Sequence, residues 1–299
     1  MLFNIYVADL QSEMKMKGYQ YADDTTLYCH AKPKNLEFLS RTTNQSIEQL
    51  GMWASNNNLA LNREKTKLMV LSTQEISRRH GLEDIELDIH IKGKKMERTE
   101  TCKLLGVTIN EHLKWENHVK IITSSCYGTL SILRKLKNVA PFRLRKQLAE
   151  SLVLAKIDYG DQVYTPLTVM LQKRLQRVQF AAASFVTGHY VKSIKDILKL
   201  GWLPIEERRD FNLLKQVFKA LNSETWPDYL QLNVRKNKRD LRSNGSKSLE
   251  IPRKESGTFQ DNAAKLFNSL PESIRNCSNY NTFLSLTNKF LVNRAQQCN

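Results

Sequence analysis

Residues 19–28 read YQYADDTTLY, in which Ala22-Asp23-Asp24 separates two short runs of strand-forming residues. Tyrosine and threonine favour extended backbone, whereas an acidic pair is typical of a tight turn. The stretch therefore predicts a β-hairpin that carries two adjacent carboxylates at its tip. An ordinary exposed turn could have the same sequence, because so short a motif also arises by chance.

Two neighbouring carboxylates at one turn suit a hard metal ion. Mg²⁺ prefers oxygen ligands in near-octahedral geometry, and proteins commonly hold it with one or two carboxylates plus substrate phosphates. In a two-metal site, the pair of ions activates the attacking oxygen and stabilises the leaving one. Asp23 and Asp24 are therefore the candidate metal ligands of this sequence.

The charge balance indicates a polyanionic partner. The 299 residues include 46 Lys and Arg against 30 Asp and Glu, a net charge of +16. Such an excess favours nucleic acid or an anionic membrane surface. No apolar run approaches the roughly 20 residues that span a bilayer, and no helix is both strongly amphipathic and basic, so we expect no membrane partner. Residues 1–9 lack a basic leader and do not resemble a secretory signal.

The cysteines give no sign of a disulfide framework or a zinc site. There are five, they are scattered, and none forms a Cys-x-x-Cys pair or has a histidine at zinc-finger spacing. We therefore expect reduced thiols and an intracellular location, with nucleus or cytoplasm left open. His112 and His118 would face different sides of a helix, which argues against a metal site there.

The first 112 residues mix strand and helix patterns. Residues 2–10 predict a buried strand or a short helix, and apolar residues after Asn35 recur at the helical spacing as far as residue 53. Strands are predicted over 59–62, 68–71, 85–91 and 103–109, of which 85–91 alternates strictly between apolar and polar residues.

Beyond Trp115 the pattern is helical. Apolar stripes predict helices over about 119–133, 141–152 and 167–186, and a fourth from Pro204. Residues 233–258 are basic and polar, which suggests a linker or an extended nucleic-acid contact, and a helical pattern returns in the last forty residues. The expected fold is α+β: a partial antiparallel sheet with a helix over 1–112, a helical region over 113–230, and a basic linker with a small helical region over 231–299.

Several segments, in order along the chain, resemble the reverse transcriptases of non-LTR (LINE-like) retrotransposons. Tyr21-Ala22-Asp23-Asp24-Thr25 is similar to the metal-binding motif of that family, and Leu61-Asn62-Arg63-Glu64-Lys65-Thr66 is similar to its following Asn-x-x-Lys-Thr motif. Residues 2–10 resemble the apolar stretch that leads to the hairpin, 104–109 and 113–115 the primer-grip strand and its exit into the thumb, and 200–209 and 264–271 later segments. The resemblance spans nearly the whole chain.

The resemblance implies roles for particular residues. Asp23 would be the main Mg²⁺ ligand, with Asp24 supporting it, and Lys65 would lie near the triphosphate, where a cation can neutralise or protonate the departing pyrophosphate. Lys103 would press on the primer strand. An RNA template with its DNA primer, or the hybrid duplex, would lie along exposed cations of the helical region: Lys120, Arg134, Lys135, Lys137, Lys173, Arg174 and Arg177. For each lysine taken singly, Lys65 included, a solvated surface position is the alternative interpretation.

The sequence also departs from the family. The palm of these enzymes needs another aspartate on a separate strand, together with fingers that hold template and nucleotide, and the resemblance would place both before residue 1. A single carboxylate pair holds two Mg²⁺ ions poorly. We therefore expect this chain to be inactive by itself, and to self-associate through apolar surface that the absent strands would cover.

Two hypotheses follow. The chain is either the carboxyl-terminal part of a retroelement RNA-directed DNA polymerase, or a basic nucleic-acid-binding protein derived from one that has lost catalysis.

Overall fold

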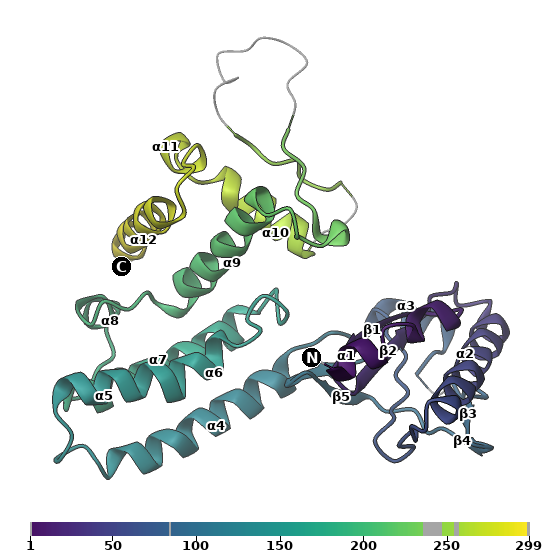
Figure 1. Cartoon of the computed structure of the whole chain (residues 1–299). Coiled ribbons are helices and arrows are strands. Elements are labelled where there is room, and N and C mark those ends of the chain that lie inside the picture. The colour runs from purple at the N-terminus through teal and green to yellow at the C-terminus, as the bar shows by residue number, and fades with distance from the viewer. Residues whose placement is uncertain (1, 84, 236–246, 254–256, 298–299) are drawn as a thin grey trace. The chain divides into compact units, whose positions relative to one another are not determined.

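The computed structural model describes residues 2–83, 85–235, 247–253 and 257–297 (Figure 1). The chain divides into two compact units, residues 1–114 and residues 115–299. The first unit mixes short strands and helices and the second is helical, which confirms the predicted α+β class. Most of the predicted linker, namely 236–246 and 254–256, lies outside the described residues.

The described residues of unit 1 form three separate two-stranded antiparallel hairpins and three α-helices. The pairs are β1 with β2, β3 with β4, and β5 with β6. Its elements are α1 (Leu2–Tyr6), the 3₁₀ turn η1 (Leu10–Glu13), β1 (Lys17–Tyr21), β2 (Asp24–Tyr28), α2 (Leu36–Asn56), α3 (Gln74–His80), β3 (His90–Ile91), β4 (Lys94–Lys95), β5 (Thr101–Leu104) and β6 (Val107–Asn110).

Helix α2 organises the small core of unit 1. Trp53 and Ala54 pack with Val7 and Leu10 in one buried cluster. α1 lies next to this core, but none of its own residues is buried. The predicted burial of residues 2–10 holds only for Val7 and Leu10.

Two of the predicted strands are absent. Residues 59–62 form no strand, and 68–71 contribute only a single bridge, from Leu68 to Arg98. The intervening turn explains part of the error, because the Asn62 side chain and carbonyl accept hydrogen bonds from the amides of Lys65 and Thr66. These bonds curl the backbone where a strand would have to continue.

The predicted strand over 85–91 is reduced to β3, although its burial pattern is confirmed. Leu87, Ile89 and Ile91 are 5%, 0% and 2% exposed. The side chain of Asn44 on α2 donates to the Asp88 carbonyl (2.7 Å) and accepts from the His90 amide (2.9 Å). A helix side chain thus takes the place of a neighbouring strand there.

Unit 2 contains most of the long helices. In chain order, the elements of unit 2 are α4 (Glu116–Arg134), α5 (Phe142–Ala149), the π-helical turn η2 (Glu150–Leu154), α6 (Ala155–Asp158), α7 (Val169–Thr187), α8 (Ile194–Lys199), α9 (Ile205–Asn222), the 3₁₀ turn η3 (Asp228–Leu230), α10 (Phe259–Asn268), α11 (Glu272–Arg275) and α12 (Tyr280–Gln297). α7 packs against α4 and α5, and α9 packs against α10 and α12 (Figure 1).

The predicted apolar stripes of α4 and α7 are confirmed. The predicted stripe residues are all buried: Val119, Ile122, Cys126, Leu130 and Leu133 on α4, and Leu171, Leu175, Val178 and Phe185 on α7. Gly188 ends α7 with φ +84°, in the left-handed region that favours glycine at this position.

The leucines spaced by four over 141–152 do not form a buried stripe. Leu144 and Leu152 are both 43% exposed. For Leu152, the π-helical turn η2 explains the difference, because its wider hydrogen-bond spacing shifts the inward face along the helix. Val153, Leu154 and Ile157 are buried instead.

Candidate active site

The acidic pair lies at the turn of the β1–β2 hairpin, as predicted. Tyr21 pairs with Asp24, so the connecting loop consists of Ala22 and Asp23 alone. Ala22 has φ +53°, and two-residue hairpin loops require a positive φ at their first position. The turn therefore places Asp23 at the tip and makes Asp24 the first residue of β2.

The hairpin is fixed to α2 through the residue that precedes it. The amide of Met16, which is buried, donates to the Ser46 hydroxyl of α2 at 3.2 Å. At Gly18 a Cβ atom would come within 2.9 Å of both Gln11 Oε1 and Leu27 Cδ2, and within 3.1 Å of the Thr26 carbonyl. A larger residue would force the Gln11 and Leu27 side chains to move and would crowd the Thr26 carbonyl, so Gly18 helps to position the hairpin, a role that sequence reasoning missed.

Both carboxylates are exposed. They supply hard oxygen donors of the kind Mg²⁺ prefers, and so fit as part of a magnesium ligand set. Across the described ranges, no group of three or more His, Cys, Asp or Glu side chains lies close enough to hold a metal ion.

Aromatic rings cover one face of the same hairpin. Tyr19 and Tyr28 stack with ring centroids 5.7 Å apart and planes 4° from parallel. The hydrogen bond to Tyr28 raises the pKa of the Tyr19 hydroxyl. Tyr21 follows Tyr19 by two residues, so it faces the same side, and it is 68% exposed. An exposed aromatic surface thus adjoins the acidic pair.

Lys65 lies on the exposed turn after Asn62. Among the described residues, no hydrogen bond or ion pair joins it to Asp23 or Asp24. Its proximity to a triphosphate therefore stays a prediction.

Lys103 lies on β5. The prediction of a single strand over 103–109 is wrong, because this segment contains parts of two paired strands. The segment is a hairpin: Leu104 pairs with Val107, and the turn residues Leu105 and Gly106 have φ +46° and +85°. Gly106 supplies the positive φ that such a turn requires. Lys103 pairs with Thr108 and its side chain is exposed.

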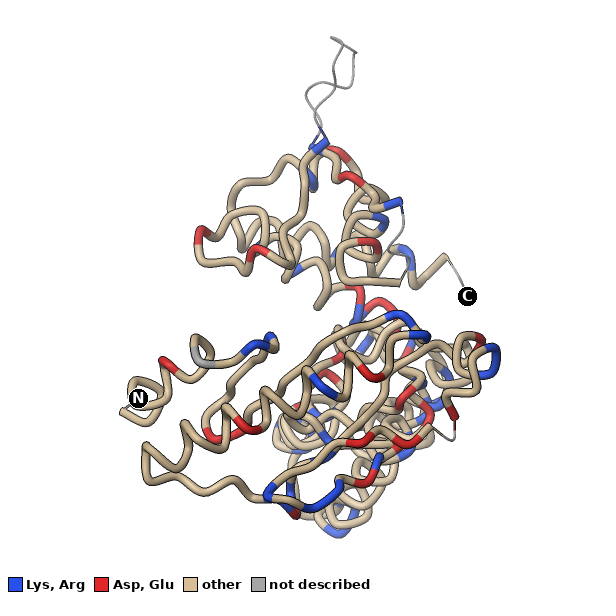
Figure 2. The backbone as a smooth tube through the Cα atoms, turned by 90° about the vertical axis from the view of Figure 1, so that its right-hand side faces the viewer, with Lys and Arg blue, Asp and Glu red and all other residues tan. Residues whose placement is uncertain are grey.

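The cations predicted for the helical region all lie in unit 2. Lys120 and Arg134 are exposed on α4, and the exposed Tyr127 lies seven residues from each, so the three share one flank of the helix. Lys173 and Arg177 are exposed on α7, Arg174 is half-buried there, and Lys135 and Lys137 are exposed in the turns that follow α4. Figure 2 marks the Lys and Arg positions along the backbone.

Residues 200–209 have a structural role that sequence reasoning did not find. Arg208 forms a two-pronged ion pair with Asp158, with distances of 2.6 Å and 2.5 Å. Arg209 donates to the carbonyls of Asp161 and Tyr164 and lies over the Tyr164 ring. These contacts fix α9 to the chain that follows α6.

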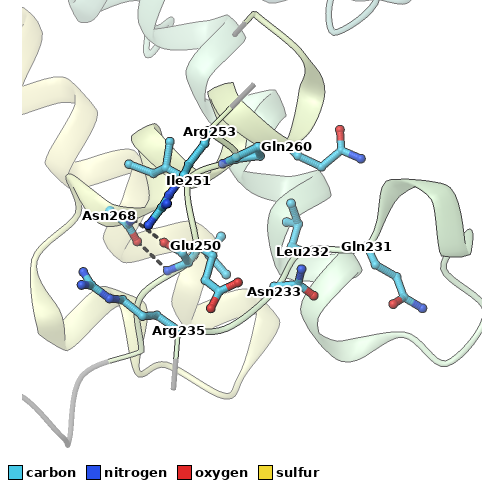
Figure 3. Close-up of a pocket in the computed structure, with 11 residues that line it drawn as sticks. Gln231, Leu232, Asn233, Arg235, Glu250, Ile251, Arg253, Gln260 and Asn268 are labelled. Atoms are coloured by element: carbon cyan, nitrogen blue, oxygen red, sulfur yellow. Dashed lines mark hydrogen bonds between the residues drawn. The ribbon is translucent and has the colours of Figure 1, made fainter. Parts of the chain in front are cut away.

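A separate cavity of about 730 Å³ lies in the carboxyl-terminal part of unit 2 (Figure 3). Arg235, Arg253 and Gln260 line it together with Asn268. The Asn268 amide accepts from the Leu249 amide (2.8 Å) and donates to its carbonyl (2.9 Å), which ties α10 to the extended segment around Leu249.

A comparison with protein families matches residues 1–109 to the reverse transcriptase (RNA-dependent DNA polymerase) family. The matched residues include the β1–β2 and β3–β4 hairpins and all but the last residue of the β5–β6 hairpin, with Asp23, Asp24, Lys65 and Lys103. No curated protein and no solved structure matches the chain. In the part of the chain that the structure describes, no helix has the length and apolar character needed to cross a bilayer.

Proposed function

We propose that this chain is part of an RNA-directed DNA polymerase of the non-LTR (LINE-like) retrotransposon type. The observation that carries the proposal is the Tyr21-Ala22-Asp23-Asp24 turn, with both carboxylates exposed at a hairpin tip inside the segment that matches the reverse transcriptase family. The order of the later motifs, from Asn62 to the segment over 200–209, supports the non-LTR type.

In this proposal the hairpin holds Mg²⁺, with Asp23 as the main ligand and Asp24 in support. Bound Mg²⁺ would supply charge stabilisation to the attacking and leaving oxygens of nucleotide addition. Asp23 contributes a carboxylate that the short loop directs away from the strands. Lys65 would supply a positive charge to the phosphates that leave, and Lys103 would contact the primer.

The chain by itself is proposed not to polymerise. Asp23 and Asp24 are consecutive residues, so their side chains point in different directions. A two-ion site needs a further carboxylate close to the pair, and the described residues place no third such side chain there. We propose that catalysis requires that residue to be supplied from elsewhere.

Manganese, a paramagnetic substitute for Mg²⁺, tests the metal assignment directly. We expect Mn²⁺ to broaden the backbone NMR signals of residues 22–25 first, and Asp23→Asn with Asp24→Asn to remove that broadening. Glu97→Gln, an exposed carboxylate elsewhere in unit 1, is the matched control and should change nothing. Broadening that survives the double substitution would overturn the metal role of the hairpin.

The second candidate function is nucleic-acid binding without catalysis. The observation that favours it is the charge of unit 2: the sequence has no acidic residue between Glu116 and Glu150, nor between Asp161 and Asp196. All the helical cations named above fall in these two stretches. Contacts of this kind recognise phosphates rather than base sequence.

Salt dependence tests this second function. For a labelled RNA–DNA hybrid, we expect the logarithm of affinity to fall steeply with the logarithm of salt concentration, by about 0.9 per phosphate contact. Lys173→Gln with Arg177→Gln should reduce this slope by about two contacts, whereas Lys219→Gln on α9 should leave it unchanged. An unchanged salt slope in the double variant would show that α7 is not part of the binding surface.

Self-association is proposed for unit 1. On α1, Leu2 and Ile5 are 84% and 69% exposed, and unpartnered apolar surface favours association. Sedimentation should give a concentration-dependent mass that Leu2→Glu with Ile5→Glu lowers. A monomer at all concentrations would contradict this.

A further inference from the structure

The two acid-free stretches of the sequence meet at one end of unit 2. A Cβ atom placed on Gly188, which follows α7, would lie 3.4 Å from Arg145 Nη1 and 3.7 Å from Lys137 Cε. Arg145 also donates to the Phe185 carbonyl on α7 at 3.3 Å. The segment after α4, the helix α5 and the end of α7 are therefore immediate neighbours.

The chain that follows α7 stays close to α5. A Cβ atom on Gly201 would lie 3.9 Å from Lys146 Nζ, and the Trp202 indole donates to Glu150 at 2.6 Å. Gly188 and Gly201 thus both lie near cations of α5, and α8, which lies between them in the sequence, packs against α7 and α12. We call this surface the basic end and define it by its cations: Arg134, Lys135, Lys137, Arg143, Arg145, Lys146, Lys192, Lys195 and Lys199.

Little acidic charge offsets these cations. Glu150 pairs with Lys146 at 3.8 Å and Asp196 pairs with Lys199 at 2.9 Å. The other seven cations of the basic end form no ion pair with any residue that the structure describes. Six of these seven are exposed, and the seventh, Arg145, stabilises the end of α7, so most of the charge is directed at a partner rather than at the fold.

Exposed aromatic rings lie among the cations. Tyr190, two residues after Gly188, is 81% exposed, and Phe142, next to Arg143 at the start of α5, is 50% exposed. Aromatic rings interspersed with cations are what a single-stranded nucleic acid requires, since rings stack on unpaired bases while cations follow the backbone.

We propose that the basic end binds single-stranded nucleic acid, with Tyr190 and Phe142 stacking on unpaired bases and the surrounding cations contacting phosphates. A duplex hides the faces of its bases, so it would engage the cations but not the rings. The site is separate from the acidic hairpin and from Lys120, Lys173, Arg174 and Arg177, although it shares Arg134, Lys135 and Lys137 with the cations proposed above to contact nucleic acid. It stands whether or not the polymerase proposal holds.

The stacking step is tested on the full chain by fluorescence anisotropy. The probes are an oligouridylate and an oligodeoxythymidylate of about 20 nucleotides, which cover RNA and DNA, and a blunt duplex of the same length. We expect Tyr190→Ala to weaken binding of the single strands about tenfold and of the duplex less than about twofold. Tyr190→Trp should preserve the affinity, and Tyr229→Ala, another exposed tyrosine of unit 2, is the matched control.

The contribution of the cations is tested with a double variant, Arg143→Gln with Lys192→Gln. We expect it to weaken both kinds of probe and to lower the single-strand salt slope by about 0.7 per contact, with Lys219→Gln as the control. If Tyr190→Ala leaves single-strand affinity unchanged, or weakens the duplex equally, the stacking site is overturned. If the single strands do not bind at low salt, the whole proposal fails. Asp23→Asn should leave every one of these affinities unchanged, which separates this test from that of the metal site.

Discussion

Residues 1–114 and residues 115–299 bury their apolar side chains to different extents. In unit 1 the strands occur as three separate pairs, and residues on α1 and the acidic hairpin, such as Leu2 and Tyr21, remain largely exposed. In unit 2 whole helix faces are enclosed, and Leu130, Val178 and Leu214 are 0% exposed. Isolated two-stranded hairpins have marginal stability in water, whereas packed helices support one another.

The difference corresponds to the two proposed roles. A metal site on a hairpin depends on neighbouring strands, both for ligands and for rigidity, and the acidic hairpin offers two exposed carboxylates to such a site. A phosphate-binding surface needs only exposed cations on a stable support, which unit 2 supplies by itself. We therefore expect unit 2 to bind nucleic acid whether or not unit 1 supports catalysis. The following predictions test this contrast between the two units.

The largest expected effect is the loss of a core side chain in unit 2. Leu175 on α7 is 0% exposed, so Leu175→Ala should lower the free energy of unfolding of unit 2 by about 3 kcal/mol through lost burial and the cavity left behind. Leu2→Ala, at an exposed position of unit 1, should change stability by less than about 0.5 kcal/mol. Urea unfolding followed by far-UV circular dichroism measures both, and similar losses would contradict the contrast.

The next effect concerns thiol reactivity. Burial raises the pKa of the Cys126 thiol to about 11, two units above the ordinary value of 9.0, so its reactive thiolate is about a hundredfold scarcer near neutral pH. Reaction with a chromogenic disulfide at pH 8 should modify the half-buried Cys29 and Cys277 first, and Cys126 only after unfolding in urea. Equal labelling rates in single-cysteine variants would show that the α4 core opens readily.

A smaller effect is expected at the ion pair between Arg208 and Asp158. Both side chains are about three-quarters buried, at 24% and 26% exposure, and the pair is two-pronged. Asp158→Asn should therefore cost about 1–2 kcal/mol of unit 2 stability. The exposed pair between Lys199 and Asp196 is the control and should contribute less than about 0.5 kcal/mol. A double-mutant cycle with Arg208→Gln measures the coupling, and a value near zero would assign the segment over 200–209 no stabilising role.

The parts of the fold that were predictable from sequence are those set by local patterns. The acidic hairpin follows from strand formers around a turn, and α4, α7 and α9 follow from apolar residues at helical spacing with Gly188 and Pro204 at their ends. In each case the residues that make the pattern also form the contacts, so no distant partner has to be known.

The rest depends on residues far apart in sequence. The pattern of residues 85–91 could not reveal that Asn44 would replace a strand partner, and the leucines over 144–152 could not reveal a π-helical turn. Asp23 and Asp24 were found because they are adjacent. The basic end was missed because its cations come from separate stretches that only the packing of α5 against α7 brings together.

Primer extension by the full chain tests the central claim most directly. With an RNA template, a DNA primer, nucleotides and Mg²⁺, we predict no template-copying synthesis above that of the Asp23→Asn, Asp24→Asn variant, although the chain binds the template and primer. Mg²⁺-dependent synthesis that the double substitution abolishes would contradict the account, because the hairpin carboxylates would then form a working site within this chain alone.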